Sequence, residues 1–121
     1  MLIRGTALVF REKKVLIVRD RGKQKFSFPG GGKNAHEPPL ATAIRELYEE
    51  LGMSARKAER IFECDTQGTV NNHKVSLIET EDKPYLRDRE LDEFIWWDMT
   101  ADIPRYHHID QILEKYSRRM K

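Results

Sequence analysis

Three glutamates within a stretch of five residues could bind a divalent cation together. Glu46, Glu49 and Glu50 are spaced i, i+3 and i+4, so a helix would place all three on one face. Carboxylates crowded in this way repel each other unless a cation neutralises them. Their oxygens are hard ligands that suit Mg²⁺ or Mn²⁺, and Mg²⁺ keeps coordination positions for water and substrate phosphate. The spacing therefore predicts a metal site that recruits a phosphorylated ligand.

A solvent-exposed acidic surface is the alternative interpretation, because Glu-rich helix faces are common and Arg45 forms an ordinary i,i+4 pair with Glu49. The glycine run at 30–32 favours the metal site. Glycine has no side chain, so its backbone can approach a metal ion or a phosphate closely. The glycine run, Glu37 and the acidic helix together form a stronger signal than any of them alone.

The spacing of these residues resembles the Nudix box, G-x5-E-x7-R-E-U-x-E-E-x-G-U, in which U is a bulky aliphatic residue. Gly31, Glu37 and the segment 45–53 match every defined position of this box. Outside the box, the segment 28–31 (FPGG) resembles the usual lead-in, and 94–98 (FIWWD) resembles the late strand with its tryptophan. The resemblance covers essentially the whole chain.

The resemblance implies a Nudix fold, which is a mixed β-sheet between helices. It also implies Mg²⁺- or Mn²⁺-dependent hydrolysis of a nucleoside diphosphate linked to another moiety. In the family, the glutamates of the REUxEE segment bind the metal ions; in this sequence they are Glu46, Glu49 and Glu50. A backbone carbonyl of the glycine run, here that of Gly30, often adds a ligand.

The resemblance also implies roles for residues around these ligands. Arg45 and Glu37 occupy the positions that orient and brace the carboxylates. The glutamate that activates the attacking water varies between subfamilies and lies either in the box or in a later loop. Glu90 is the later-loop candidate here, as an extra metal ligand or as the base. Glu93 competes with it, and a solvated loop acid is the plain alternative.

An amphipathic helix over 38–51 is the strongest element signal in the sequence. Pro38 and Pro39 fit its first turn, where the N–H that proline lacks would have no partner. Gly52 fits a left-handed cap at its end. The apolar positions recur with helical spacing on one side: Leu40, Ala43, Ile44, Leu47 and Leu51.

Strand-like runs flank this helix, and a second amphipathic helix is expected at the end of the chain. The predicted strands are 6–10, 15–18, 26–28, 59–66, 74–80 and 93–98, and 11–14 is the expected hairpin turn. The second helix, 107–119, carries its apolar residues on one side: Ile109, Ile112, Leu113, Tyr116 and Met120. This order predicts an α/β or α+β sandwich, a mixed sheet with helices on its faces.

The composition predicts one domain over residues 1–121 and excludes several protein classes. Of the 121 residues, 39% are hydrophobic and 35% are charged, which excludes collagen, low-complexity disorder and a membrane protein. A single cysteine, Cys64, excludes an internal disulfide. The start of the chain lacks the layout of a signal peptide, so we expect a cytoplasmic protein that does not bind a membrane.

The charge distribution contains a basic segment near the start. The net charge is only +2, but residues 11–25 hold seven bases, which could steer an anionic substrate or form a solvated hairpin surface. The bases are Arg11, Lys13, Lys14, Arg19, Arg21, Lys23 and Lys25. The expected partner is a nucleotide; duplex DNA is not expected, and a homodimer is left open.

A housecleaning nucleoside triphosphate pyrophosphohydrolase is the first choice of function, because the sequence holds little beyond the minimal fold. The alternative enzymes act on ADP-ribose or another nucleotide sugar, or on an RNA 5′ end. A non-catalytic Nudix-like module that senses a nucleotide is the alternative from another class. One departure from the family pattern is His36, where glycine is frequent, so we expect the loop before Glu37 to differ in shape.

Overall fold

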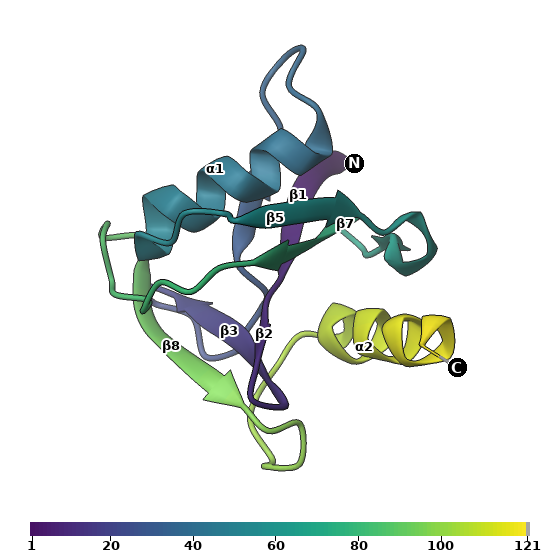
Figure 1. Cartoon of the computed structure of the whole chain (residues 1–121). Helices are drawn as coiled ribbons and strands as arrows, with labels where there is room; N and C mark the ends of the chain where they lie inside the picture. The colour runs from purple at the N-terminus through teal and green to yellow at the C-terminus, as the bar shows by residue number, and fades with distance from the viewer. Residues whose placement is uncertain (121) are drawn as a thin grey trace.

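The computed structural model of the protein describes residues 1–120, which form two β-sheets and two α-helices (Figure 1). The larger sheet has the strand order β4-β1-β7-β5, with β6 paired to β7, and the smaller sheet has the order β2-β3-β8. The elements are β1 (Leu2–Leu8), β2 (Phe10–Arg11), β3 (Lys14–Asp20), β4 (Gly30–Gly32), α1 (Pro39–Leu51), β5 (Lys57–Arg60), the 3-10 helix η1 (Phe62–Cys64), β6 (Thr66–Gln67), β7 (Asn71–Glu79), β8 (Leu91–Trp97) and α2 (His107–Arg119).

The larger sheet is mixed because β1 pairs in parallel with β7 and antiparallel with β4. Its remaining pairs, β5 with β7 and β6 with β7, are antiparallel. The glycine run, which the sequence presented only as permissive backbone, is the short strand β4. It pairs with β1 in the register Thr6 to Gly30 and Arg4 to Gly32, so the sheet fixes the glycines beside α1.

The smaller sheet begins with the hairpin that the sequence predicted at 11–14. Arg11 pairs with Lys14, and the two intervening residues, Glu12 and Lys13, both have positive φ angles, of 51° and 65°. This two-residue turn matches the twist of the flanking strands although neither residue is glycine. β3 then pairs antiparallel with β8, which joins the hairpin to the segment that follows Glu90.

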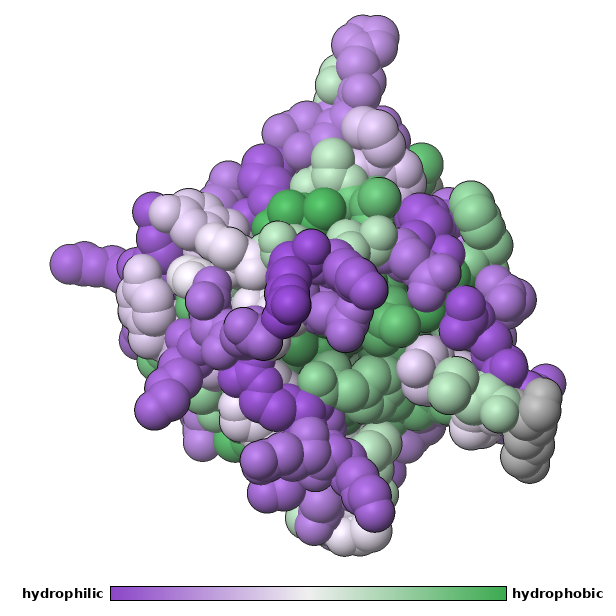
Figure 2. Space-filling view, viewed as in Figure 1, coloured by the Kyte–Doolittle hydropathy of each residue, from purple (hydrophilic) through white to green (hydrophobic). Residues whose placement is uncertain are grey.

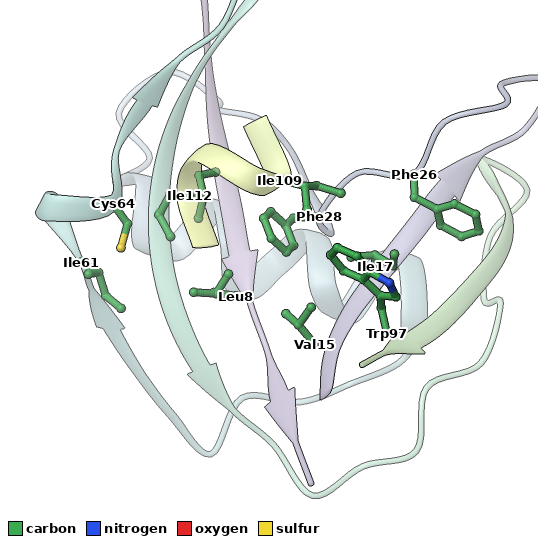
Figure 3. Close-up of a cluster of buried hydrophobic side chains, with 11 residues drawn as sticks. Leu8, Val15, Ile17, Phe26, Phe28, Ile61, Cys64, Trp97, Ile109 and Ile112 are labelled. Carbon is green, nitrogen blue, oxygen red and sulfur yellow. The ribbon is translucent and has the colours of Figure 1, made fainter. Parts of the chain in front are cut away.

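Two separate apolar cores lie on opposite faces of the strands, which confirms the expected sandwich. At the end of β1, Ala7 and the next residue after the strand, Val9, pack with α1, whereas Leu8 between them packs with α2. Figure 3 shows the second core, in which Leu8 and Phe28 lie below the apolar side of α2. In the space-filling view, hydrophilic side chains cover most of the face, and apolar surface shows through in the middle and along the right edge (Figure 2).

Three details of the predicted elements are wrong. The strand expected at 59–66 is instead β5, a turn of η1 and the two-residue β6. The segment 26–28 forms isolated bridges, from Ser27 to Val18 and from Phe26 to Arg105, and no strand of its own. Met120 lies beyond the end of α2 and is exposed, so it does not join the apolar side of that helix.

Candidate active site

Helix α1 positions the acidic residues because its opposite side is anchored in the core. Ala43, Leu47 and Leu51 are completely buried against the sheet. The helix begins with Pro39 and ends at Gly52, which adopts the expected left-handed conformation (φ 67°) and donates its N–H to the Tyr48 carbonyl. The predicted start and cap are therefore confirmed within one residue.

Glu46, Glu50 and Glu90 form a cluster in which one carboxylate oxygen of each lies within 4.8 Å of the others. Glu46 and Glu50 come from consecutive turns of α1, and Glu90 comes from the loop before β8. Glu49 lies outside this cluster: its side chain is 46% exposed and faces Arg45 at 3.3 Å. The helix therefore supplies two of the three clustered carboxylates, and the loop supplies the third.

Glu93, the competitor of Glu90, points away from the cluster. Its carboxylate is paired with the Arg19 guanidinium at 3.1 Å. It belongs to β8, opposite Arg19 on β3. The structure thus places Glu90, and not Glu93, beside the carboxylates of α1.

The glycine strand β4 lies in direct contact with the carboxylates of α1. The Gly30 N–H donates to Oε1 of Glu50 at 3.1 Å. A β-carbon added at Gly31 would lie 2.4 Å from the carboxyl carbon of Glu46, closer than any side chain tolerates. Glycine at position 31 therefore lets strand β4 and Glu46 of α1 meet, whereas a β-carbon at Gly30 would overlap the Gly5 carbonyl of β1.

The raised pKa values of two clustered carboxylates, Glu46 and Glu50, indicate that a bound cation would stabilise their ionised form. Burial raises the pKa of Glu50 to about 8, although the Gly30 N–H and the positive charge of Arg4 act in the opposite direction. Burial also raises the pKa of Glu46, with repulsion from Glu49 and Glu90 adding to it. A divalent cation favours the ionised form of such carboxylates, and an all-oxygen donor set suits Mg²⁺ or Mn²⁺. The residues present therefore fit the expected metal.

Arg45 and Glu37 hold the acidic turn from the side of the preceding loop. Arg45 donates from Nε to Glu37 Oε2 at 2.8 Å and from Nη1 to Glu46 Oε2 at 3.1 Å. Glu37 also accepts from the Thr42 hydroxyl and from the Asn34 N–H. The Arg45 hydrogen bond is the largest influence on Glu37 and lowers its pKa to about 2. This geometry agrees with the bracing role that the resemblance implies.

His36 adopts the backbone conformation that glycine would favour. Its φ angle is 65°, and the Glu37 N–H donates to the Asn34 carbonyl across the turn. The histidine thus adopts the left-handed conformation that glycine takes readily, and a difference in shape between this loop and that of relatives stays a prediction.

A pocket of about 620 Å³ opens beside the carboxylate cluster. Arg4 and Asp20 line it and connect it to the cluster through the strands: Arg4 lies on β1, which pairs with the glycine strand β4 that bonds Glu50, and Asp20 on β3 pairs with Leu91, the residue after Glu90. Arg4 donates from Nη2 to the Phe28 carbonyl at 2.9 Å, and its buried Nε has no partner among residues 1–120. Rings and side-chain amides make up much of the remaining lining: Tyr106, His73, His107, His108, Gln67, Asn71 and Gln111.

Two histidines meet in this pocket, and sequence reasoning did not predict their contact. The rings of His73 and His108 are stacked with their centres 4.1 Å apart. Burial lowers the pKa of His73 to about 4 and that of His108 to about 3, so both rings are neutral at neutral pH. His73 shares a hydrogen bond of 2.9 Å between its Nδ1 and the Thr6 hydroxyl. No local spacing could have indicated the pair, because one ring belongs to β7 and the other to α2.

Residues 2–116 of the chain match the family model of the NUDIX domain. The chain belongs to the Nudix family. Its Nudix box thus runs from Gly31 in β4, through the bracing Glu37, to α1 and its glycine cap.

Two curated Nudix relatives match most of the chain. A Mycobacterium tuberculosis protein provisionally named 8-oxo-dGTP diphosphatase 3 is 30% identical over 109 residues, which cover 83% of this chain and 49% of the relative. An RNA pyrophosphohydrolase of Escherichia fergusonii is 30% identical over 98 residues, covering 81% of this chain and 55% of the relative. The chain thus spans about half the length of these relatives.

Solved Nudix structures match the fold over nearly the whole chain. A provisionally assigned Nudix hydrolase family member from Chromobacterium violaceum superimposes with a TM-score of 0.83 and 26% identity, covering 98% of this chain and 77% of that chain. MutT from Burkholderia pseudomallei superimposes with a TM-score of 0.74 and 17% identity, covering 94% and 96%. Among residues 1–120, no helix is both long and apolar enough to cross a membrane.

Proposed function

We propose that this Nudix chain is a divalent-metal-dependent pyrophosphohydrolase that cleaves a nucleoside diphosphate linked to another moiety, with a nucleoside triphosphate as first choice. The observation that carries the proposal is the meeting of Glu46, Glu50 and Glu90 within 4.8 Å beside a polar pocket. A cluster of carboxylates that ranges from buried Glu50 to exposed Glu90, next to such a pocket, suits a substrate with a charged phosphate chain and a planar base.

The proposed ligands of Mg²⁺ or Mn²⁺ are the clustered carboxylates, with Glu49 and the Gly30 carbonyl as further family-implied ligands. When bound, the metal would neutralise phosphate charge and lower the pKa of a water molecule. Arg45 and Glu37 would hold the carboxylates in place. Glu90 is the proposed base or extra ligand, because it reaches the cluster from an exposed loop and is not fixed in the helix.

The pocket is the proposed site of the nucleoside end of the substrate. Arg4 lines this pocket together with the stacked histidines, so its guanidinium can contact a phosphate oxygen while the base lies against the rings. Neutral rings and amides can stack on a base and form hydrogen bonds to its edge. Because both histidines are neutral, they add no positive charge to that of Arg4. A second positive charge in the pocket would favour binding of a free phosphate over binding of a base.

A metal-dependent nucleotide panel tests this function. Metal-free protein should be inactive, and Mg²⁺ or Mn²⁺ should restore release of pyrophosphate or monophosphate products. The panel should include ordinary and oxidised deoxynucleoside triphosphates, ADP-ribose, nucleotide sugars and triphosphorylated RNA. Unchanged turnover in excess chelator would contradict the proposed mechanism.

The names of the relatives are the reason for including triphosphorylated RNA and ADP-ribose in the panel. Several curated relatives are named RNA pyrophosphohydrolase, and solved Nudix structures include an ADP-ribose pyrophosphatase from Streptococcus suis. A binding module is also represented, because one solved Nudix domain, from Shewanella oneidensis NrtR, is complexed with ADP ribose. Tight nucleotide binding without turnover of any panel member would favour the module.

The roles of Glu90 and Glu93 can be separated by matched substitutions. Glu90→Gln should lower kcat roughly 5- to 150-fold, because a metal-linked or basic carboxylate is lost from the cluster. Glu93→Gln should have little effect, because Glu93 pairs with Arg19 outside the cluster. Both variants should be compared at saturating Mg²⁺, with circular dichroism to confirm folding. The reverse ranking would assign the role to Glu93.

A cytoplasmic location and a homodimer stay predictions for this protein.

A further inference from the structure

The loop that carries Glu90 is held by main-chain contacts on two sides. On one side it passes the C-terminal end of α1, where the Tyr85 and Arg87 N–H groups donate to the Leu51 and Glu50 carbonyls (Figure 1). These bonds use helix carbonyls that have no partner within the helix. These two hydrogen bonds fix the middle of the loop, but they do not fix the residues 88–90 that follow.

Arg21 holds that remaining part of the loop. Its backbone N–H donates to the Glu90 carbonyl at 2.7 Å, and its side-chain Nε donates to the Arg89 carbonyl at 2.8 Å. Its Nη2 reaches the Leu91 carbonyl at 3.4 Å. One residue at the end of β3 thus contacts three successive carbonyls, with Glu90 in the centre.

A β-bulge follows immediately and changes the direction of the strand. Arg19 is paired with Glu93 but Asp20 with Leu91, so Asp92 is an extra residue in β8. Arg19 binds this extra residue, donating from Nε to Asp92 Oδ1 at 2.9 Å. Bulges redirect neighbouring side chains, and this one lies two residues after Glu90.

We propose that Arg21 is a positioning residue that binds the carbonyls of residues 89–91 and thereby aims the Glu90 carboxylate at Glu46 and Glu50. The inference rests on the proposed function, in which Glu90 serves the metal cluster. It also gives one base of the segment 11–25 a third role: the Arg21 side chain donates to the protein's own carbonyls, whereas the sequence left open either steering of an anionic substrate or a solvated hairpin surface.

The test is a double-mutant cycle between Arg21 and Glu90 in the full chain, measured by two methods. Electron paramagnetic resonance gives the Mn²⁺ affinity without substrate, and steady-state kinetics give kcat and KM separately. The variants are Arg21→Ala, Arg21→Lys and Glu90→Gln, with Arg21→Ala also placed in the Glu90→Gln background. Lys23→Ala is the matched control, because Lys23 lies in the same turn and its backbone N–H donates to the Asp20 carbonyl.

Arg21→Ala should weaken Mn²⁺ binding and lower kcat by about 3- to 10-fold each, the range expected for losing one or two net hydrogen bonds, with KM unchanged. Arg21→Lys should fall between Arg21→Ala and the unmodified protein, and Lys23→Ala should match the unmodified protein. In the Glu90→Gln background, Arg21→Ala should have no further effect, because the carboxylate it positions is gone.

Different failures point to different errors. If Arg21→Ala raises KM while leaving Mn²⁺ affinity and kcat unchanged, or if its effect adds fully to that of Glu90→Gln, Arg21 does not act through Glu90. If Arg21→Ala unfolds the chain, the same comparison is made with Arg21→Lys, and full additivity again overturns the proposal. If the unmodified protein neither binds Mn²⁺ nor hydrolyses a nucleotide, the proposed function itself fails and the inference falls with it.

Discussion

Gly31 and Glu46 touch so closely that a single methyl group at residue 31 would overlap the Glu46 carboxylate, 2.4 Å from its carboxyl carbon. Gly31→Ala should therefore displace that carboxylate while sparing the fold, because the flexible end of Glu46 can move. Mn²⁺ affinity and kcat should each fall roughly 10- to 100-fold, as when an outer support of a metal ligand is lost.

Gly32→Ala is the matched control for this prediction. A β-carbon at Gly32 would meet nothing within 4 Å, although the residue is the next one along the same strand. Thermal unfolding should be similar in both variants, and only Gly31→Ala should lose Mn²⁺ binding in a titration. Equal losses in the two variants would mean that strand β4 as a whole, and not the contact with Glu46, was disturbed.

The second prediction concerns the pH dependence of stability. The folded pKa of Glu50 is raised to about 8 by burial, from 4.5. Its stabilising contribution is thus complete below pH 4.5 and is lost as the pH rises through 8. Glu50→Gln is neutral throughout. In the metal-free state the variant should gain stability relative to the unmodified protein between pH 5 and pH 8.5, by roughly 2–4 kcal/mol.

Urea unfolding in the presence of a chelator measures this difference at both pH values. Saturating Mg²⁺ should stabilise the unmodified protein at pH 8.5 more than it stabilises Glu50→Gln, because the cation binds the ionised carboxylate. Parallel stability curves for the two proteins would show that Glu50 ionises normally in the fold.

The third prediction assigns substrate binding to Arg4. Because Arg4 lines the pocket beside the cluster, Arg4→Gln should raise KM for nucleotides about tenfold through loss of a charged hydrogen bond to phosphate. Arg4 also opposes the raised pKa of Glu50, so the kinetics should be measured at saturating Mg²⁺, which favours the ionised form of Glu50 in both proteins. Arg4→Lys, which keeps the charge, should recover part of the loss; an unchanged KM in Arg4→Gln would place the phosphates elsewhere.

The fourth prediction concerns His36, which adopts a φ angle of 65° in the turn before Glu37. A side chain in the left-handed region is strained, and glycine relieves this strain while losing more entropy on folding. His36→Gly should therefore raise the free energy of unfolding by about 0.5–1 kcal/mol in urea titrations. His36→Ala keeps the β-carbon and should show no gain. A destabilised glycine variant would indicate that the imidazole itself stabilises the loop.

The parts of the site that sequence reasoning could place are those encoded within α1. Apolar spacing located this helix, and the same spacing placed Glu46 and Glu50 on one face beside Arg45. The same argument put Glu49 on that face, yet Glu49 faces Arg45, because clustering also depends on what lies opposite the helix. The opposing group, Glu90, is set by contacts of the loop with α1 and with Arg21, which no local pattern encodes.

The segment around Ile61 shows why the predicted strand at 59–66 extended beyond the end of β5. Ile61 and Cys64 are both completely buried, and their i, i+3 spacing follows the turn of η1 and not the alternation of a strand. The run of apolar and polar residues at 59–66 is too short for either period to dominate. The pocket was missed for a different reason: His73 of β7, which shares a hydrogen bond with Thr6, and His108 of α2, which lies beside Phe28, stack only after α2 has packed onto the sheet.

The parallel pairing of β1 with β7 has a consequence for how the protein is made. Among the strands of this domain, β1 leaves the ribosome before the others, but its parallel partner spans residues 71–79, and the partner of β3 spans 91–97. Until those residues emerge, the nascent chain exposes apolar strands whose pairing is non-local, a state that folds slowly and aggregates readily. A message truncated anywhere before the codon for Trp97 would therefore release a chain with an unfinished sheet, and such fragments should be degraded or captured by chaperones.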